Sequence, residues 1–404
     1  MNKKPKVMFS NFKNNWKMFS FSNLAKVFQS GGTPSTKVIN YWNGKIPWLQ
    51  SSDIQKDILF GVKPQKFISE EGLQNSSAKL ISKNSIAIVT RVGVGKLAIM
   101  EQDYATSQDF LSLSDFNGDT QFIVYSIYRM LQKESTQLQG TSIKGITKED
   151  LLSKKISLPE IDEQSAIGSL FRTLDDLLSS YKDNLANYQS LKATMLSKMF
   201  PKAGQTVPEI RLDGFKSEWE LLEINDLADD FQSGGTPKTN VQEYWNGDIP
   251  WIQSSDLETN CLFEIKVQKS ISEKGLKNSS AKIIPKDSIA VVTRVGVGKL
   301  VVMRHEYATS QDFLSLSNLK SNIEFTAYLL YRLLQKEVTQ LQGTSIKGIT
   351  KVELLSKKVL IPSLLEQQAI GTYFTNLDNL ISAHQEKISQ LETFKKKLLQ
   401  DMFI

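Results

Sequence analysis

The eight residues Thr90 to Leu97, which read TRVGVGKL, recur letter for letter as Thr293 to Leu300. Working outward from this stretch, residues 5–200 align with residues 208–403 without a gap, at a constant separation of 203 positions. Solenoids repeat every ~20–50 residues, so a period this long indicates a duplicated domain pair. Two similar modules suit a two-fold symmetric target such as duplex DNA. Duplication for stability alone is the alternative.

Each copy begins with a zone of mixed secondary structure. The runs Ser85 to Thr90 and Ser288 to Thr293 are short, apolar and rich in β-branched residues, which predicts buried strands. Helices are expected at residues 121–137 and 324–340, where apolar residues cluster on part of a helical wheel. Turn residues surround these segments. We therefore expect an α+β domain in each copy.

Each copy ends with a long segment in which apolar residues recur at gaps of three and four, the spacing of a coiled coil. The predicted helix-pairing residues are Ile167, Leu170, Leu174, Leu177, Leu185, Ile370, Leu377, Ile381, Ile388 and Leu391. A helix with one narrow apolar stripe must bury that stripe against another element, and the long helix of the other copy is the obvious partner. If a pseudo-two-fold axis relates the copies, the two helices form an antiparallel coiled coil. His384 lies on the stripe and is expected to be a core or edge residue.

The predicted segments follow from this division. They are a first α+β domain (1–159), a first long helix (160–201), a linker with the start of the second repeat (202–216), a second α+β domain (217–362) and a second long helix (363–404).

The composition excludes several classes of protein. Hydrophobic residues make up 40% and charged residues 23% of the 404 residues, which is typical of a folded, soluble protein. We see no bilayer-spanning apolar run and no secretion signal, so no membrane association and a cytoplasmic location are expected. One cysteine, Cys261, permits no intrachain disulfide. A net charge of +6 permits a polyanionic partner without proving one.

No catalytic centre is expected in this chain. The segment Gly93 to Lys96 resembles a phosphate-binding loop, but Thr90 stands where the first glycine belongs and Leu97 where Ser or Thr belongs. Two histidines and one cysteine leave almost nothing for a zinc site or a histidine acid/base centre. Methyltransferase motifs are also missing. We therefore predict no catalytic residue, no metal site and no cofactor bound by this chain.

The blocks that both copies keep are polar or small, and Ser, Thr, Gln and Arg are side chains that contact phosphates and base edges. Glycine lets the backbone approach a ligand closely. A purely structural role in turns and core is the alternative, and it is favoured for Trp42 and Trp48. The candidate DNA-binding residues are Ser30, Gly31, Gly32, Thr33, Ser51, Ser52, Arg91, Lys96, Ser107, Gln108 and Lys144, with their counterparts Ser233, Gly234, Gly235, Thr236, Ser254, Ser255, Arg294, Lys299, Ser310, Gln311 and Lys347.

Several of these blocks together resemble a known family, the specificity (HsdS) subunits of type I restriction–modification systems. The residues that carry the resemblance are Pro208 to Phe215 before Trp219, Ser233 to Pro237, Tyr244 to Gly247, Ile249 to Trp251, the helix entries Leu158 to Gln164 and Ile361 to Gln367, and the long helices that follow. The match covers essentially the whole chain. It is looser at the N-terminus, where Lys6 to Phe9 replaces Glu209 to Leu212.

The resemblance implies that each α+β domain recognises one half of an interrupted double-stranded DNA site and that the helices fix the gap between the halves. It implies two modification (HsdM) subunits, which carry S-adenosylmethionine and methylate adenine, and restriction (HsdR) subunits, which give an ATP-dependent nuclease. S-adenosylmethionine, ATP and Mg²⁺ are therefore expected on the partners.

Because the two recognition domains are near-copies, we hypothesise that the two half-sites are the same or nearly so when read on opposite strands. Three alternatives remain at this point. The chain could be the specificity subunit of a type II (IIB-like) enzyme, a coiled-coil protein adaptor without DNA specificity, or a self-sufficient nuclease.

Overall fold

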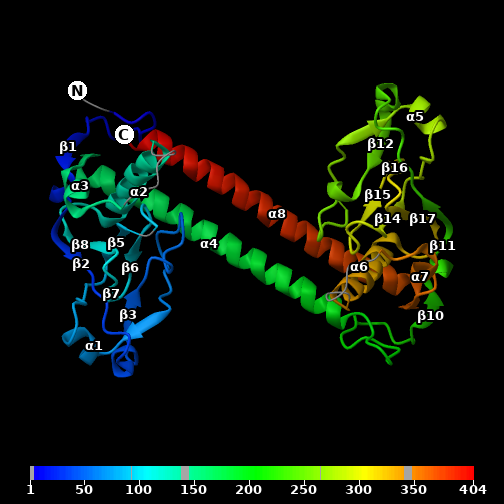
Figure 1. Ribbon diagram of the computed structural model, residues 1–404, viewed down its shortest axis with the longest axis horizontal. Helices are drawn as coiled ribbons and strands as arrows, with labels where there is room; N and C mark the ends of the chain where they lie inside the picture. The colour runs from blue at the N-terminus through cyan, green and yellow to red at the C-terminus, as the bar shows by residue number, and fades with distance from the viewer. Residues whose placement is uncertain (1–3, 92, 138–144, 264, 341–347) are drawn as a thin grey trace. The chain divides into compact units, whose positions relative to one another are not determined.

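The computed structural model describes residues 4–91, 93–137, 145–263, 265–340 and 348–404. The chain forms two compact units (Figure 1). Unit 1 comprises Met1–Lys182 together with Glu386–Ile404, and unit 2 comprises Asp183–Gln385. The C-terminal stretch of the chain therefore belongs to unit 1. The predicted segments treated each long helix as a separate piece, whereas by compactness each long helix is divided between the two units.

Unit 1 contains three small sheets, ordered β1-β9, β2-β8-β5-β6 and β4-β3-β7. Its elements are β1 (Lys17–Ser20), β2 (Ala25–Ser30), β3 (Ile46–Leu49), β4 (Lys66–Ile68), α1 (Glu70–Gln74), β5 (Ser85–Val89), β6 (Leu97–Met100), β7 (Ala105–Thr106), β8 (Phe110–Phe116), α2 (Thr120–Gln137), α3 (Lys148–Ser153), β9 (Lys155–Leu158) and the start of α4 (Ile161–Lys198).

Unit 2 repeats this order, with sheets β10-β18, β11-β17-β14-β15 and β13-β12-β16. Its elements are the end of α4, then β10 (Glu220–Glu223), β11 (Ala228–Ser233), β12 (Trp245–Ile252), β13 (Lys269–Ile271), α5 (Glu273–Lys277), β14 (Ser288–Val292), β15 (Leu300–Met303), β16 (Ala308–Thr309), β17 (Phe313–Leu319), α6 (Ile323–Gln340), α7 (Lys351–Leu355), β18 (Lys358–Ile361) and the first part of α8 (Leu364–Met402). The predicted buried strands and the predicted helices near 121–137 and 324–340 are confirmed.

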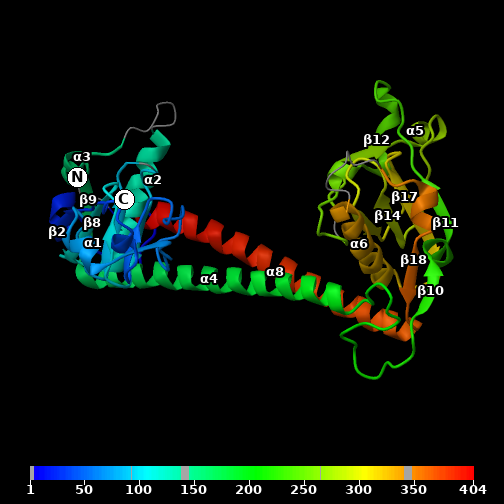
Figure 2. The same ribbon diagram turned by 60° about the horizontal axis from the view of Figure 1, so that its bottom comes forward.

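The four-stranded sheet of each unit is covered on both faces, which explains why its central strand is apolar at consecutive positions. In β5, Ile86 and Ile88 join the larger core, which α2 also lines, whereas Ala87 and Val89 join a smaller core with Leu49 of β3. Successive strand residues point to opposite faces, so an alternating pattern would have left one face polar. In unit 2, α6 covers the equivalent face against β14 and β15 (Figure 2).

The two long helices run antiparallel inside each unit. In unit 1, Lys182 of α4 pairs with Glu392 of α8, while Asp175, earlier in α4, pairs with Lys395, later in α8. The predicted positions Ile167, Leu170, Leu174, Ile388 and Leu391 all lie in the core of unit 1 or pack against it. In unit 2, Ile370 and Leu377 are buried, and Leu185 and Ile381 are half-buried.

One helix-pairing prediction is wrong. Leu177 is 39% exposed, and its counterpart Leu380 is 42% exposed. Both lie at the edge of the stripe, since Leu177 is one residue before the buried Leu178 and so points about 100° away from it around the helix. His384 contacts the Tyr188 ring edge-on, with centroids 5.1 Å apart, as expected for a residue at the edge of a helix pair.

Each unit is completed by the end of the other repeat's helix. In unit 1 the ring of Phe403 stacks on Phe122 with centroids 5.3 Å apart. In unit 2 the counterpart Phe200, which follows α4, stacks on Phe325 at 5.6 Å. The internal repeat, the α+β class and the antiparallel helix pairing are thus confirmed. Within the described ranges, none of the helices is long and apolar enough to cross a membrane.

Candidate nucleic-acid interface

The blocks that the two repeats share meet at one edge of each unit, because the strands that precede them end there. Ser30 at the end of β2 pairs with Leu111 of β8, and Val89 at the end of β5 pairs with Phe110 of the same strand. Strands β3 and β7 run parallel and also end together, with Leu49 opposite Thr106. We call the segments at and after these strand ends in unit 1, residues 30–33, 50–53, 90–91, 93–96 and 106–109, the strand-end cluster.

Hydrogen bonds tie the segments of this cluster together. The Gly32 amide donates to the Thr106 carbonyl at 2.8 Å, and the Ser107 amide donates to the Leu49 carbonyl at 2.9 Å. A Cβ at Gly31 would lie 2.0 Å from Thr106 Oγ1 and 2.3 Å from the Ser107 carbonyl oxygen. Only glycine permits this approach of two backbones. The Gly-Gly pair is therefore explained by packing of the turn.

Four predicted contact residues of the cluster are exposed in unit 1: Ser30, Ser52, Arg91 and Gln108. Thr33 is half-buried and donates its hydroxyl to Gln108 Oε1 at 2.6 Å. In that bond the amide oxygen of Gln108 is the acceptor. The NH₂ group of Gln108 is then left to donate a hydrogen bond to a base or a phosphate. The unit 2 counterparts Ser233, Ser255, Arg294 and Gln311 are exposed as well, and Thr236 bonds Gln311 in the same way at 2.5 Å.

Other predicted contact residues form hydrogen bonds inside the cluster and do not lie on its surface. Ser107 and Ser310 are buried, 5% and 4% exposed, and their hydroxyls accept from the amides of Asp109 and Asp312. A hydroxyl engaged inside a turn cannot reach DNA unless the turn opens. We therefore keep the prediction of direct contact with DNA for the exposed residues of the cluster.

Lys96 is also engaged within the protein. Its ammonium donates to the Ser51 carbonyl, 3.4 Å away, and its counterpart Lys299 donates to Ser254 at 3.4 Å and to Leu257 at 2.7 Å. The lysine clamps the β5–β6 hairpin, in which Gly93 and Gly95 have positive φ, onto the segment that follows β3. This clamp leaves Arg91 as the exposed cation of the segment.

The remaining candidates have clear positions. Gly32 and Gly235 are buried and Gly234 is half-buried; Ser51 and Ser254 are half-buried and lend their carbonyls to the lysine clamp. Lys144 and Lys347 lie outside the described residues. Gly145, which follows Lys144, is described, and a Cβ there would lie 2.8 Å from the Thr90 carbonyl.

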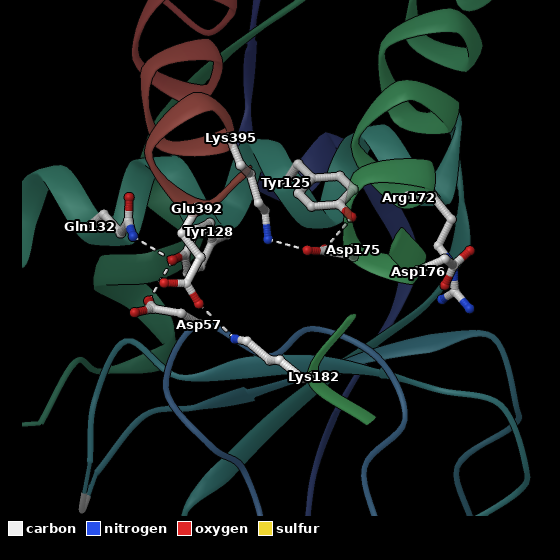
Figure 3. Close-up of polar contacts among 10 residues, drawn as sticks. All are labelled: Asp57, Tyr125, Tyr128, Gln132, Arg172, Asp175, Asp176, Lys182, Glu392 and Lys395. Atoms are coloured by element: carbon white, nitrogen blue, oxygen red, sulfur yellow. Dashed lines mark hydrogen bonds and ion pairs between the residues drawn. The ribbon is translucent and has the colours of Figure 1, made fainter. Parts of the chain in front are cut away.

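Helix α2 carries polar side chains toward the long helices (Figure 3). The Tyr125 hydroxyl donates to Asp175 of α4 at 2.5 Å, and Lys395 of α8 forms an ion pair with the same carboxylate. Burial, with the nearby Asp175 charge, raises the pKa of Tyr125 well above its usual range, so the hydroxyl stays protonated and donates. We call these three residues the unit 1 triad. Lys395 is 8% exposed, so its charge depends on this partner.

One turn further along α2, a second tyrosine reaches the loop that follows residues 50–53 of the strand-end cluster. Tyr128 donates to Asp57 at 2.5 Å and accepts from Gln132 at 2.5 Å (Figure 3). Burial is the main cause that raises the pKa of Tyr128, followed by its bond to Asp57. Helix α2 therefore joins the loop beside the cluster to the helix pair inside unit 1.

Unit 2 holds the matching triad with the helices exchanged. Tyr328 of α6 donates to Asp378 of α8 at 2.7 Å, and Lys192 of α4 pairs with Asp378 at 2.5 Å. Sequence reasoning missed both triads because it followed apolar residues only. A lysine and an aspartate kept at equivalent positions of both long helices were the available signal.

The described residues contain no group of three or more His, Cys, Asp or Glu side chains placed to hold a metal ion. The exposed predicted contact residues of each unit are two serines, one glutamine and one arginine. Such a surface can bind phosphates and base edges.

The comparisons with known proteins point to one family. The model of the type I restriction modification DNA specificity domain matches residues 13–188 and again residues 216–393. The type I restriction enzyme MjaIX specificity subunit of Methanocaldococcus jannaschii is 28% identical over 194 residues, which cover 46% of this chain and 44% of that protein. The MjaVIII specificity subunit of the same organism is 22% identical over 403 residues, 95% of this chain and 91% of that protein. The EcoR124I/EcoR124II specificity subunit of Escherichia coli is 31% identical over 38% of this chain and 40% of that protein.

Two solved structures share the fold. The S subunit of a type I restriction–modification system from M. genitalium superposes with a TM-score of 0.66 at 16% identity, over 100% of this chain and 99% of that one. A chain from a structure on complex assembly and conformational transition of the type I system gives 0.54 at 17% identity, over 95% and 96%. Since the family model covers both repeats, the chain belongs to the type I restriction–modification DNA specificity family.

Proposed function

We propose that this chain is the DNA-specificity subunit of a type I restriction–modification complex and that each unit reads one half of a two-part DNA site. The observation that carries the proposal is the duplicated strand-end cluster. Both units expose the same serines, glutamine and arginine on a framework of identical hydrogen bonds. Selection for stability alone does not explain why these exposed donors are identical in the two repeats while nearby exposed residues differ.

The same observation favours a symmetric site. Arg91 and Arg294, and Gln108 and Gln311, emerge from matching turns, so they present the same donors to DNA. Two half-sites that are read by the same surface have the same sequence when they are read on opposite strands. The target is therefore an interrupted palindrome or nearly one, and the long helices set its gap.

The proposed partners are double-stranded DNA, two modification subunits (HsdM) and restriction subunits (HsdR). Each unit offers an apolar docking position on both long helices, which supports subunit binding there. Leu177 and Phe394 are 39% and 50% exposed in unit 1, and their equivalents Leu380 and Leu191 are 42% and 37% exposed in unit 2. Their recurrence at equivalent positions of both units supports the proposal.

The chemistry belongs to the partners in this proposal. S-adenosylmethionine, ATP and Mg²⁺ act on the modification and restriction subunits, and the complex works in the cytoplasm, where the DNA is. The chain itself supplies recognition and spacing.

A binding selection tests the proposal. The complex of this chain with its modification subunit is incubated with random duplexes, and bound DNA is sequenced. Two short blocks at a fixed gap are expected, each the mirror of the other. A protein adaptor would enrich no sequence, and a self-sufficient nuclease would cut DNA with Mg²⁺ and no partner. The neighbouring genes separate the type I complex from a type II enzyme, in which one partner chain cuts and methylates.

A further inference from the structure

An open pocket lies beside the strand-end cluster of unit 1, on the sheet that contains β3 and β4. Its lining consists of Thr36, Trp42, Asn43, Gly44, Gln65, Lys66 and Phe67. Trp48, the neighbour of Trp42 at 4.9 Å between ring centroids, donates its indole N–H to the Gly32 carbonyl at 3.0 Å. The pocket and the cluster therefore share a continuous framework, and a duplex that reaches one lies close to the other.

Charge around this pocket suits nucleic acid. Lys66 extends over both indole rings, 5.7 Å from the Trp42 centroid and 5.9 Å from the Trp48 centroid. Lys37 and Lys45 are exposed on neighbouring segments. Among the described residues, none of these three lysines forms an ion pair with a carboxylate. Three unneutralised cations beside an open pocket attract a polyanion.

Phe67 is an apolar residue of the lining, and it is 41% exposed. It lies opposite Pro47 in the β3–β4 ladder, so its backbone position is fixed while its ring remains accessible. Apolar side chains at a DNA surface contact the 5-methyl group of thymine, which no other standard base carries. An exposed phenylalanine between DNA-attracting cations is suited to that methyl group.

The equivalent position in unit 2 differs in this respect. Ser270 occupies the place of Phe67, opposite Pro250 in the same register, and the indole pair with its lysine is retained. A serine hydroxyl donates or accepts and has no preference for a methyl group. The substitution changes the chemistry of this lining position. Asn240 and Asp248 also stand where unit 1 has the neighbouring cations Lys37 and Lys45.

We propose that the unit 1 pocket binds the methyl group of a thymine through Phe67, and that the mirror-image base of the other half-site is read without that requirement. The inference rests on the proposed function, since it assigns one base to a DNA-reading surface. Phe67 then makes a nearly palindromic site unsymmetrical at this base.

The test replaces each thymine of the selected site by deoxyuridine, which lacks the methyl group, and measures binding by the complex of this chain with its modification subunit. Replacing one particular thymine of the unit 1 half-site should lower the affinity of the complex for DNA about fourfold, which corresponds to the burial of one methyl group. The mirror position in the unit 2 half should lose nothing. In Phe67→Ser the loss should disappear, and in the reciprocal Ser270→Phe a loss should arise in the unit 2 half.

Both variants should fold, because each residue already stands at the equivalent strand position of the other unit. If the complex selects a two-part site but Phe67→Ser and wild type respond alike to every deoxyuridine, the pocket assignment is overturned and the proposed function survives. If the wild-type complex selects no site, the proposed function fails and this assignment fails with it.

Discussion

The two units bury the same glutamate at the start of the long helix but satisfy it differently. In unit 2, Arg211 holds Glu366 with two bonds of 2.7 Å, from Nε and from Nη2. In unit 1, methionine stands at the position equivalent to Arg211, and Glu163 accepts only a 3.2 Å bond from Trp16. Burial raises the pKa of Glu163. Scaffold contacts of this kind have diverged between copies, whereas the exposed donors of the strand-end clusters have not.

This contrast separates residues kept for assembly from those kept for recognition. The triads are buried and identical, so they are needed for both units to accept a helix end. The exposed donors of the strand-end clusters are also identical, and packing does not explain them. Residues that differ, such as Arg211 and Phe67, mark where one copy acquired its own property.

Breaking a triad should give the largest effect. Lys395→Met leaves the Asp175 carboxylate buried without its cation, and such a loss costs ~3–5 kcal/mol. Urea unfolding of the full chain, followed by tryptophan fluorescence, measures it. Lys192→Met should cost a similar amount in unit 2, since the two triads are equivalent.

Lys182→Met is the matched control, because its pair with Glu392 is about half exposed on both sides and should be worth less than ~1 kcal/mol. Equal losses in Lys395→Met and Lys182→Met would contradict the role of the triad.

Arg211→Met sharpens the comparison between the two buried glutamates. It converts unit 2 to the unit 1 residue at this position but leaves Glu366, which is 1% exposed, without a cation. We expect a loss of about 2–3 kcal/mol, the cost of an unpaired buried charge. Hydrogen exchange of the backbone amides of unit 2 measures this loss of stability. An exchange rate equal to that of the wild type would show that Trp219 or water satisfies Glu366 instead.

The exposed arginines should act equally in the two units. Arg91→Ala and Arg294→Ala should each weaken DNA binding about tenfold, and each should reduce the slope of log affinity against log salt by ~0.9 if the arginine contacts one phosphate. Lys96→Ala should leave the salt slope unchanged, because its ammonium is engaged with the Ser51 carbonyl. A reduced slope for Lys96→Ala and none for Arg91→Ala would reverse the two roles.

The smallest effect concerns pH. Because burial raises the folded-state pKa of Glu163, its contribution to stability is present below the unfolded value, about 4.3, and is lost as pH rises through the folded value. Glu163→Gln should therefore raise the melting temperature at pH 7, and the gain should shrink as pH falls toward 4. A Gln variant that melts lower at pH 7 would mean that the carboxylate is stabilised by its surroundings.

Much of the fold could be predicted from the sequence because the repeat and the apolar stripes are long-range patterns. The strands at Ser85 and Ser288 and the helices near 121–137 and 324–340 followed from local periodicity. Leu177 was misplaced because spacing alone does not show which residues of the stripe lie at its exposed edge.

The candidate site was predicted in its composition but not in its roles. Repetition identified Ser107, Lys96 and Arg91 alike, although only Arg91 is exposed without a partner inside the turn. Whether a polar side chain faces a carbonyl or solvent depends on segments distant in sequence. The triads depend on the same kind of distant contact, since Lys395 and Asp175 lie 220 positions apart.

Methylation mapping tests the central claim that two near-identical units read one two-part site. DNA from cells that express this chain with its modification subunit is sequenced for methylated adenine. We predict methylation in two short blocks at a fixed gap, which are mirror copies except at the position that Phe67 reads. Two unrelated blocks, or no sequence-specific methylation despite a modification subunit shown to be active, would contradict the account.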